Sequence, residues 1–506
     1  MQETVAVKKD KYPLSLSQKN IWNVELSHKG TSINNICSTI RIEGRFDLAR
    51  IKEAINLVLM RDSTLRTRIT AEGDVPLQYT VPFEEEQFPV FDFSLTGRSG
   101  VAHWEAAVTR EAMELLDSPL YSFAIFRTGE EDGGILVKVH HIISDGWSQM
   151  LMSNRIAEAY LALLSAEQPD TSPSPSYALH IERENGYLAS SAYERDMAFW
   201  EDRLSGFSAP SSIRECKSAS LSPVGQRRTF RLSGVLNHAI KSFCDEYRVA
   251  PFSVLYMALA IYLRRTGGRD NIAIGVPVLN RVNFSEKQST GMFVSTLPFI
   301  GRIDESWTLK QFNEELSDAW YDLLRHQKLS FSEINSAAKR LHPDMARLFD
   351  IVLSYQNSRT FKSRDASVTF SGRWHYSGYQ AEPLLIHLSS MDEDFRYSID
   401  YDYLTQVFSA QDIEQLHGYL MQILGEALSH PDAPIWQLSM LGHDEQEKVL
   451  FSFNDTARPR ESESVAGAFV RTAREHPDRA AVICGGVRTA SYTHLHPFGI
   501  VGLFPL

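Results

Sequence analysis

The chain has 506 residues, of which 43% are hydrophobic and 23% charged, a balance typical of a globular protein with two or three compact units. Its net charge of −12 argues against a general nucleic-acid-binding surface. No apolar run approaches the ~20 residues that cross a membrane, and residues 1–12 are a polar lead-in without a signal-peptide core. We therefore expect a cytoplasmic protein with no membrane or nucleic-acid partner.

The predicted elements of the first half alternate between strands and helices. A serine precedes an apolar-periodic run near residues 12–22, which indicates a capped helix. Strands are expected at 35–43, 77–81, 121–127 and 134–140, a turn followed by a strand at 61–69, and helices at 46–60, 101–116 and 148–164. Strands that alternate with helices predict a two-layer α/β unit, in which the helices pack on the sheet.

A stretch rich in Pro and Ser at residues 167–176 predicts an exposed linker. The second half then has a similar order of elements, although no sequence repeat is visible. Helices are expected at 192–204, 236–247, 251–265, 309–326 and 410–428, and strands at 228–232, 271–277, 292–303, 349–356, 366–374, 384–389 and 395–402. Two halves of similar size and order indicate a repeated lobe, with a pocket between the lobes as a common place for a ligand.

The sequence therefore predicts four segments. They are a lead-in at 1–12, a first lobe at 13–176, a second lobe at 177–430, and a linker with a short C-terminal piece at 431–506. The last piece is too short for another large enzyme domain. The cysteines are scattered without CxxC spacing and predict reduced thiols, neither a disulfide framework nor a zinc site; they are Cys37, Cys216, Cys244 and Cys484.

The stretch most indicative of chemistry is His140-His141-x-x-x-Asp145-Gly146, which follows a hydrophobic strand and precedes a helix. Imidazole titrates near neutrality and can take a proton from an amine or a hydroxyl. An aspartate close behind can orient the ring or pair with an arginine, and Gly146 is expected to allow a turn where a side chain would not fit. The pattern alone also fits a polar loop, or a metal site for which no further ligand stands out.

This stretch resembles the HHxxxDG signature of condensation domains in nonribosomal peptide synthetases, which chloramphenicol acetyltransferase shares. Other motifs of that family occur here in order, and the resemblance covers about residues 12–430. They are Ser15–Trp22 (SxAQxRLW, arginine replaced), Arg61–Thr67 (RHxxLRT), Gly275–Arg281 (GxPxxxR), Gly291–Pro298 (GxFVNTLP, with Ser295 where asparagine is usual), His326-Gln327 (HQ) and Leu348–Asn357 (PLFDVxFxxQN). The motif between the lobes is degenerate at Tyr177–Ile181.

The last residues resemble a different family. Phe453–Thr456 and Pro477–Val482 look like the first residues of an adenylation domain, and Ser491–Leu495 continues that pattern. Residues 497–506 depart from it, and the alternative is a divergent tail. We expect a truncated adenylation-domain start with no activity of its own, because its ATP-binding and acyl-activating motifs are absent.

The resemblance implies an α/β (α+β) fold of two chloramphenicol acetyltransferase-like lobes, arranged as a pseudo-dimer with a central tunnel. A donor acyl or peptidyl thioester and an acceptor aminoacyl thioester would enter its opposite ends, and the acceptor amine would attack the donor carbonyl. The implied partners are upstream and downstream peptidyl carrier proteins, whose phosphopantetheine holds the substrates, and an adenylation domain. We expect a monomer that binds no cofactor or metal itself.

The resemblance also implies roles for individual residues. His141 would act on the substrate amine, as a base or by orienting it, and His140 would be mainly structural. Asp145 would pair with an arginine, with Arg66 as first choice and Arg61 as second; solvated charge is the alternative for either arginine. Gly146 N–H could meet the oxyanion. The residues expected to line the tunnel, with ordinary packing or capping as the alternative, are Trp147, Ser148, Ser295, Thr296, Ser354 and Gln356.

Several alternatives exist within and outside this family. An epimerization domain would need a glutamate motif that is not found, and a heterocyclization domain would have DxxxxD in place of HHxxxDG. A non-catalytic recruitment module would be marked by loss of His141, which is present. A CoA-dependent acyltransferase, or a starter-type domain that loads a fatty acyl group, remains open. No carrier domain precedes Tyr12, so the donor is expected from another protein or from CoA.

Overall fold

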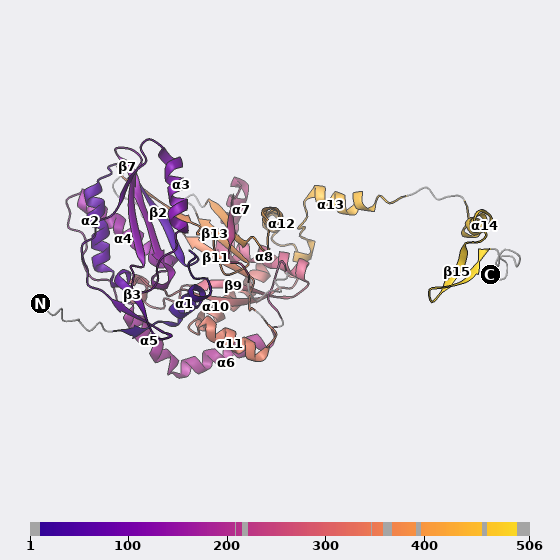
Figure 1. Cartoon of the computed structure of the whole chain (residues 1–506), viewed down its shortest axis with the longest axis horizontal. Coiled ribbons are helices and arrows are strands. Elements are labelled where there is room, and N and C mark those ends of the chain that lie inside the picture. Colours follow the sequence, from indigo (N-terminus) through magenta and orange to yellow (C-terminus); the bar gives the residue numbers. More distant parts are fainter. Residues whose placement is uncertain are drawn as a thin grey trace. The chain divides into compact units, whose positions relative to one another are not determined.

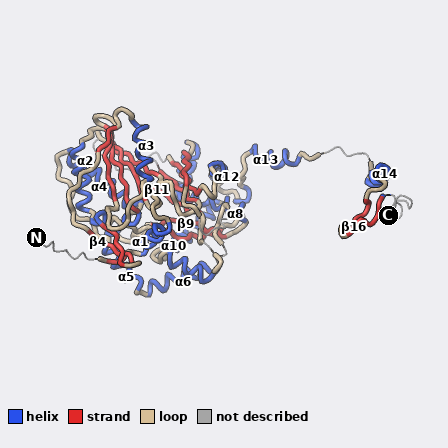
Figure 2. The backbone as a smooth tube through the Cα atoms, in the orientation of Figure 1, coloured by secondary structure: helices blue, strands red, loops and turns tan. Residues whose placement is uncertain are grey.

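The computed structural model describes residues 11–207, 209–214, 221–345, 347–357, 367–390, 396–457 and 463–492. The chain divides into two compact units, Met1–Met440 and Leu441–Leu506. The first unit holds two large sheets with separate hydrophobic cores (Figure 1). Figure 2 shows these sheets as red strands with blue helices around them. No helix among the described residues has both the length and the apolar composition to cross a membrane.

The sheet of the first half has five strands in the order β12-β2-β7-β6-β5. The strands are β2 (Asn35–Glu43), β5 (Val90–Asp92), β6 (Tyr121–Arg127), β7 (Asp132–His140) and β12 (Thr369–His375). Side chains alternate between the two faces of a strand. In β7, Ile135, Val137 and Val139 therefore pack in the main core with α2 (Leu48–Arg61) and α4 (Gly146–Leu164), while Leu136 packs toward α3 (Gly97–Arg110). Burial on both faces explains why β7 is almost continuously hydrophobic.

Smaller elements complete the first half. Three short strands pair in the order β1-β4-β3, and α1 begins at a capping box in which Ser15 and Gln18 satisfy each other's backbone N–H groups. The bounds are β1 (Tyr12–Pro13), α1 (Leu16–Ser27), η1 (Ser63–Arg66), β3 (Thr67–Glu72), β4 (Val75–Thr80) and η2 (His141–Ile143).

The sheet of the second half has six strands in the order β10-β9-β11-β13-β14-β8. The strands are β8 (Gly225–Arg231), β9 (Asn271–Val278), β10 (Ser295–Arg302), β11 (Ile351–Asn357), β13 (Leu384–Ser390) and β14 (Tyr397–Leu404). The helices are α5 (Ala178–Leu188), α6 (Ser191–Ser205), α7 (Gly234–Tyr247), α8 (Pro251–Gly267), α9 (Phe284–Gln288), α10 (Leu309–Arg325), α11 (Phe331–Leu341) and α12 (Ala410–Ser429). Helix α8 has ten consecutive buried residues, Val254–Leu263, and lies at the centre of this core.

One strand departs from the predicted division at residue 177. Strand β12 comes from the second half of the sequence but pairs with β2 of the first-half sheet over its whole length, from Thr369↔Glu43 to His375↔Cys37. Val368, next to β12, is fully buried in the first-half core. The two lobes are therefore joined by an exchanged strand, and the hydrophobic pattern of β12 could not show which sheet it would join.

The first unit also extends ten residues beyond the predicted boundary at 430. The short helix η3 (Ile435–Gln437) follows α12, and the side chain of Ile435 is fully buried. The backbone N–H groups of Ile435 and Trp436 donate to the carbonyls of Trp307 and Glu305. Residues 431–440 therefore pack against the rest of the first unit and do not form a free linker.

The second unit, taken by itself, contains two α-helices, a short 3-10 helix and a hairpin among its described residues. They are α13 (His443–Leu450), η4 (Ser452–Asn454), α14 (Val465–Glu475), β15 (Ala480–Cys484) and β16 (Val487–Ser491). Strands β15 and β16 pair antiparallel, and Gly485 and Gly486 form the turn between them. Their φ values of 56° and 77° are positive, which glycine adopts more easily than other residues. Residues 497–506, where the sequence departs from the adenylation pattern, lie outside the described residues.

Candidate active site

The site is built where β7 ends and α4 begins. The backbone N–H of His140 donates to the carbonyl of Leu120, and that of His141 donates to the carbonyl of Asn34. Both histidines are thus fixed at the C-terminal end of β7, the central strand of the first-half sheet. Residues His141–Ile143 form a single turn, and Asp145 then caps α4 by accepting a hydrogen bond from the backbone N–H of Ser148.

His140 points into the protein and is almost completely buried. Its Nδ1 accepts a hydrogen bond from the backbone N–H of Ile142 at 3.2 Å, and its Nε2 lies 3.5 Å from Glu25 Oε2. Asn34 donates to the same carboxylate oxygen at 2.7 Å. Burial by itself would raise the pKa of Glu25, but His140 and Asn34 hold it below its ordinary value. The contacts of His140 hold α1 and the turn after β7 together.

His141 is half-buried and lines a large cavity. Its Nδ1 is buried without a hydrogen-bond partner among the described residues. Burial lowers the pKa of His141 below its ordinary value of 6.5, although the nearby carboxylate of Asp145 acts in the opposite direction. The ring is therefore neutral at pH 7 and has a lone pair that can accept a proton.

Asp145 has no exposed surface and pairs with Arg281, not with the predicted Arg66 or Arg61. Arg281 Nη1 donates to Asp145 Oδ2 at 2.7 Å, and Nη2 donates to Oδ1 at 3.1 Å. Burial alone would raise the pKa of Asp145, but the charge and hydrogen bonds of Arg281 hold it below the ordinary value. Asp145 is therefore an ionised group whose oxygens are occupied by the protein.

Arg281 comes from the loop after β9 and also lies over the ring of Phe293 at 4.0 Å. The backbone N–H groups of Phe293 and Val294 donate to Asp145 Oδ2. The ion pair therefore ties the beginning of α4 to the segment before β10 of the second-half sheet. Arg281 is the last residue of the GxPxxxR motif, so its motif membership was the available signal for this partner.

The two arginines predicted to pair with Asp145 serve elsewhere. Arg66 donates to the backbone carbonyls of Leu59 and Val81, at 3.0 and 2.7 Å. Arg61 pairs with Asp170 at 2.8 Å and donates to the carbonyl of Ser172, so it holds the Pro- and Ser-rich linker. A further buried pair that the sequence did not indicate joins Arg155 of α4 to Asp62 at 2.6 Å.

Gly146 was expected to allow a backbone turn where a side chain would not fit, and this expectation was wrong. Its φ is not positive, and a Cβ built on it meets no atom within 4 Å. It is the first residue of α4, where the backbone N–H has no partner inside the helix. It also lines the cavity. The absence of a side chain therefore leaves cavity space open rather than relieving strain.

This arrangement predicts that Gly146→Ala will fold normally but react more slowly. Alanine is the better helix former by up to about 1 kcal/mol, so the free energy of unfolding should be unchanged or slightly higher. The added methyl group would occupy the space beside His141, and we expect at least about a tenfold fall in kcat/KM. Thermal unfolding and steady-state kinetics check this. Equal activity in the variant would show that the space is not used.

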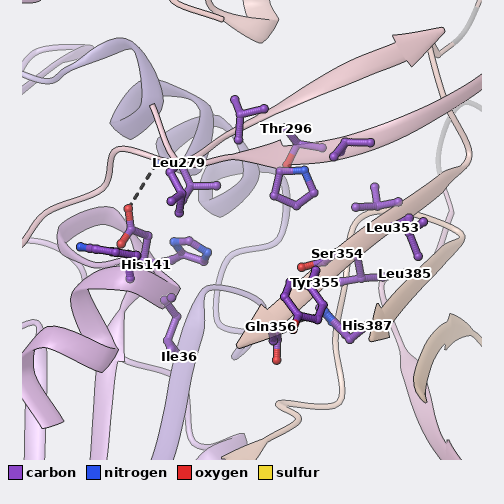
Figure 3. Close-up of a pocket in the computed structure, with 18 of the residues that line it drawn as sticks. Ile36, His141, Leu279, Thr296, Leu353, Ser354, Tyr355, Gln356, Leu385 and His387 are labelled. Atoms are coloured by element: carbon purple, nitrogen blue, oxygen red, sulfur yellow. Dashed lines mark hydrogen bonds between the residues drawn. The ribbon is translucent and has the colours of Figure 1, made fainter. Parts of the chain in front are cut away.

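The cavity of about 1520 Å³ is lined by residues of both halves, including most of the predicted lining residues. Those present in its walls are His141, Asp145, Gly146, Trp147, Ser295, Thr296, Ser354 and Gln356. Figure 3 shows His141 on one side, with Thr296, Ser354, Gln356 and His387 on strands across from it. Trp147 Nε1 donates to the carbonyl of Lys287 at 2.9 Å.

Ser148 was expected to line the cavity, but it is not among the lining residues. It is buried, and its hydroxyl lies 2.8 Å from both Asp145 Oδ1 and the carbonyl oxygen of Gly291, so its single proton is donated to one of these two acceptors. Arg281 Nη2 donates to the same hydroxyl at 2.8 Å. Ser148 therefore belongs to the buried polar network around Asp145. No cluster of three or more His, Cys, Asp or Glu that could hold a metal occurs in the described part of the chain.

The lowered pKa of His141 predicts a pH dependence. A neutral base must lose activity as it becomes protonated, so kcat/KM should fall with decreasing pH. Because the pKa lies below 6.5, that fall should be centred below pH 6.5. A pH profile of kcat/KM with pre-loaded substrates checks this. An α-amino group on the substrate itself titrates at about pH 7.7–8.0, so only the part of the fall that His141→Ala lacks reports on the ring. A midpoint of that part at or above pH 7 would contradict the neutral, half-buried ring.

Comparisons with known proteins agree with this architecture. The family model described as "Condensation domain" matches residues 8–450. Surfactin synthase subunit 1 of Bacillus subtilis (strain 168) is 28% identical over 491 residues, which cover 96% of this chain and 14% of that protein. Bacitracin synthase 3 of Bacillus licheniformis is 24% identical over 502 residues, which cover 96% of this chain and 8% of that protein. The chain thus spans less than a fifth of the length of these relatives.

Solved structures show the same fold. A mutant of the starter condensation domain of rhizomide synthetase in complex with C8-CoA has a TM-score of 0.76 at 20% identity, with 85% of this chain and 98% of that chain covered. The first condensation domain of the calcium-dependent antibiotic synthetase with a substrate analogue has a TM-score of 0.74 at 21% identity, with 85% and 100% covered. The predicted α/β fold of two lobes is confirmed. With a family match that covers most of its length, this chain belongs to the condensation-domain family of nonribosomal peptide synthetases.

Proposed function

We propose that this domain forms an amide bond between a donor acyl or peptidyl thioester and the amine of a carrier-bound aminoacyl thioester. The observation that carries the proposal is a neutral, half-buried His141 on the wall of a cavity of about 1520 Å³ lined by both halves. Such a cavity has room for two extended substrates and places their reacting ends beside one proton acceptor.

In the proposed reaction, the acceptor amine attacks the donor carbonyl carbon and a C–N bond forms. The amine loses a proton to His141 as the tetrahedral intermediate develops, and the carbonyl oxygen becomes negative. The backbone N–H of Gly146, at the N-terminus of α4, is the proposed donor to that oxygen. The C–S bond then breaks, and the departing thiolate takes the proton from His141. Holding the amine in place is the other contribution that His141 makes.

The proposed partners follow from this chemistry. Both thioesters would be delivered on phosphopantetheine arms of carrier proteins, one upstream and one downstream. We propose that Leu441–Leu506 corresponds to the first residues of an adenylation domain, and that an adenylation domain of the synthetase activates the acceptor amino acid. In support, the alignment with surfactin synthase subunit 1 covers 96% of this chain and so extends beyond residue 450, where the condensation model ends.

A second candidate is a starter-type reaction, in which the donor is a fatty acyl group on CoA or on a carrier. One observation favours it: part of the cavity is lined by large apolar side chains of the second half. They are Phe252, Leu316, Trp320, Leu324, Phe331 and Phe349. An apolar wall of this kind favours an alkyl chain, because each buried CH₂ contributes about 0.8 kcal/mol.

The proposal is tested by an in vitro condensation assay with mass spectrometry of the acceptor carrier. One arm uses an aminoacyl donor carrier, and a second uses octanoyl-CoA; both use the same aminoacyl acceptor carrier. Amide on the acceptor in the first arm supports the elongation reaction, and amide only in the second arm supports the starter-type reaction. If neither arm gives amide across a panel of acceptors, a recruitment module is the better description.

A further inference from the structure

A second polar cluster lies in the same cavity, away from the histidine pair. We call Ser354, Gln356, His387, Asp402 and Arg227 the polar wall. All five line the cavity, and they come from strands β11, β13, β14 and β8. Figure 3 shows Ser354, Gln356 and His387 together on neighbouring strands, with His141 on the other side of the view.

The strand register places these side chains on one face of the sheet. Ser354 of β11 lies beside His387 of β13, and Asp402 of β14 lies beside Arg227 of β8. The opposite face carries Ile386, Tyr401 and Tyr403, which belong to the hydrophobic core. Because side chains alternate along a strand, the polar residues face away from that core and toward the cavity.

The polar wall is a chain of hydrogen bonds that begins at a buried ion pair. Arg227 donates to both oxygens of Asp402, at 2.6 and 2.7 Å. Burial alone would raise the pKa of Asp402, but Arg227 and His387 hold it below its ordinary value. An ionised Asp402, 3.3 Å from His387 Nε2, favours the ring tautomer with its proton on Nε2.

That tautomer leaves a lone pair on His387 Nδ1, which lies 3.0 Å from Gln356 Nε2. The amide NH₂ of Gln356 must therefore face His387, and its Oε1 is left for another donor. No described residue donates to Gln356 Oε1, and the hydroxyl of Ser354 likewise has no partner among them. Gln356 is only half-buried, so its carboxamide is accessible from the cavity.

Arg227 is paired with Asp402 at 2.6 Å and lies 3.7 Å from a second carboxylate, Asp400, so a substrate carboxylate would find no free cation in the polar wall. Gln356 and Ser354, the members of the polar wall that still have hydrogen-bonding capacity for a ligand, are uncharged. A hydroxyl or an amide N–H would find an oriented acceptor in Gln356 Oε1 and a flexible hydroxyl in Ser354. Apolar substrates of the same shape would leave these groups unpaired, at a cost in binding.

We propose that Gln356, oriented by His387 and Asp402, is a specificity-determining residue that selects a substrate with a neutral hydrogen-bond donor, a hydroxyl or an amide N–H. This inference rests on the proposed amide-forming function. The donor group could belong to either the acyl donor or the amino-acid acceptor, since both occupy the cavity.

The test uses two isosteric pairs of substrates with the full-length chain. The donor pair is 3-hydroxybutanoyl and 3-methylbutanoyl thioester, and the acceptor pair is threonyl and valyl thioester on the same carrier. We expect kcat/KM to favour the hydroxylated member of one pair by about tenfold or more. The pair that shows the preference identifies the substrate that the polar wall contacts.

Gln356→Leu should reduce that ratio to near one, and His387→Leu should reduce it in the same direction because the carboxamide can then rotate. Leu385→Ala is the matched control, since Leu385 also lines the cavity beside His387 and offers no hydrogen bond; it should leave the ratio unchanged. Gln356 is half-buried, so its variant should fold even if the His387 variant does not.

Three outcomes would overturn the inference. They are a wild-type ratio near one in both pairs, an equal loss for both members of a pair in Gln356→Leu, and an unchanged ratio in that variant. An equal loss would show that Gln356 contacts a part common to all substrates, such as the pantetheine arm. Absence of amide from every substrate would instead count against the proposed function, so the two failures are distinguishable.

Discussion

Replacement of His141 by alanine is expected to lower kcat for amide formation by about 10²- to 10⁴-fold, the range that a positioned base contributes. The ring lines the cavity with a lowered pKa, and its Nδ1 forms no hydrogen bond within the described residues. Its removal should therefore cost little stability. Single-turnover assays with loaded carriers measure the rate, and thermal unfolding checks the fold.

His140 offers the matched control for this experiment. It has the same side chain and is adjacent in sequence, but its ring nitrogens contact Ile142 and Glu25 inside the protein. His140→Ala should therefore lower stability more than His141→Ala does. A His141→Ala variant that forms amide at the wild-type rate would contradict the proposed role of His141 in catalysis.

The second large effect is expected from Arg281→Leu, which should reduce the free energy of unfolding by about 3–5 kcal/mol. Both side chains of the Arg281–Asp145 pair are fully buried. Loss of the guanidinium leaves the Asp145 carboxylate buried without its counter-charge, and also removes the donor to Ser148 Oγ. Denaturant titration at pH 7 measures the loss. Activity should fall as well, because the ion pair positions the first turn of α4 next to His141.

Two comparisons make this prediction specific. Arg340→Leu removes an ion pair of similar length, 2.8 Å to Glu201, whose side chains are about half exposed; it should cost at most about 1 kcal/mol. Adding Asp145→Asn to Arg281→Leu removes the unpaired charge and should recover part of the stability. Equal destabilisation by Arg281→Leu and Arg340→Leu would contradict the role assigned to the buried pair.

The stabilising effect of this pair should also depend on pH. The pKa of Asp145 is lower in the folded protein than its ordinary value of 3.8. The stabilisation is therefore fully present above about pH 4 and is lost as the pH falls through the folded-state pKa. The difference in stability between the wild type and Arg281→Leu should shrink in strong acid.

Local features of the site could be predicted from the sequence because they depend on neighbours along the chain. A hydrophobic run that ends at His140 forms β7, and an aspartate three residues before Ser148 caps α4. The order of family motifs also predicted the two lobes and the family. Each of these inferences uses residues that are a few positions apart, or the order in which the motifs follow one another along the chain.

Contacts between distant segments were decided only by the tertiary structure. Arg281 is 136 positions from Asp145, and nothing in the spacing favours it over Arg66 or Arg61, the two partners that the sequence predicts. Strand β12 likewise has a strand pattern that fits either sheet, yet it completes the first-half sheet.

The contacts within the polar wall were also decided only by the tertiary structure. Gln356, His387 and Asp402 lie on three strands and become neighbours only through strand register. The sequence by itself determined which segments form strands and helices and where the histidine pair is presented. The tertiary structure decided which charges meet in the buried interior, because a buried charge needs a partner in space, wherever that partner lies in the chain.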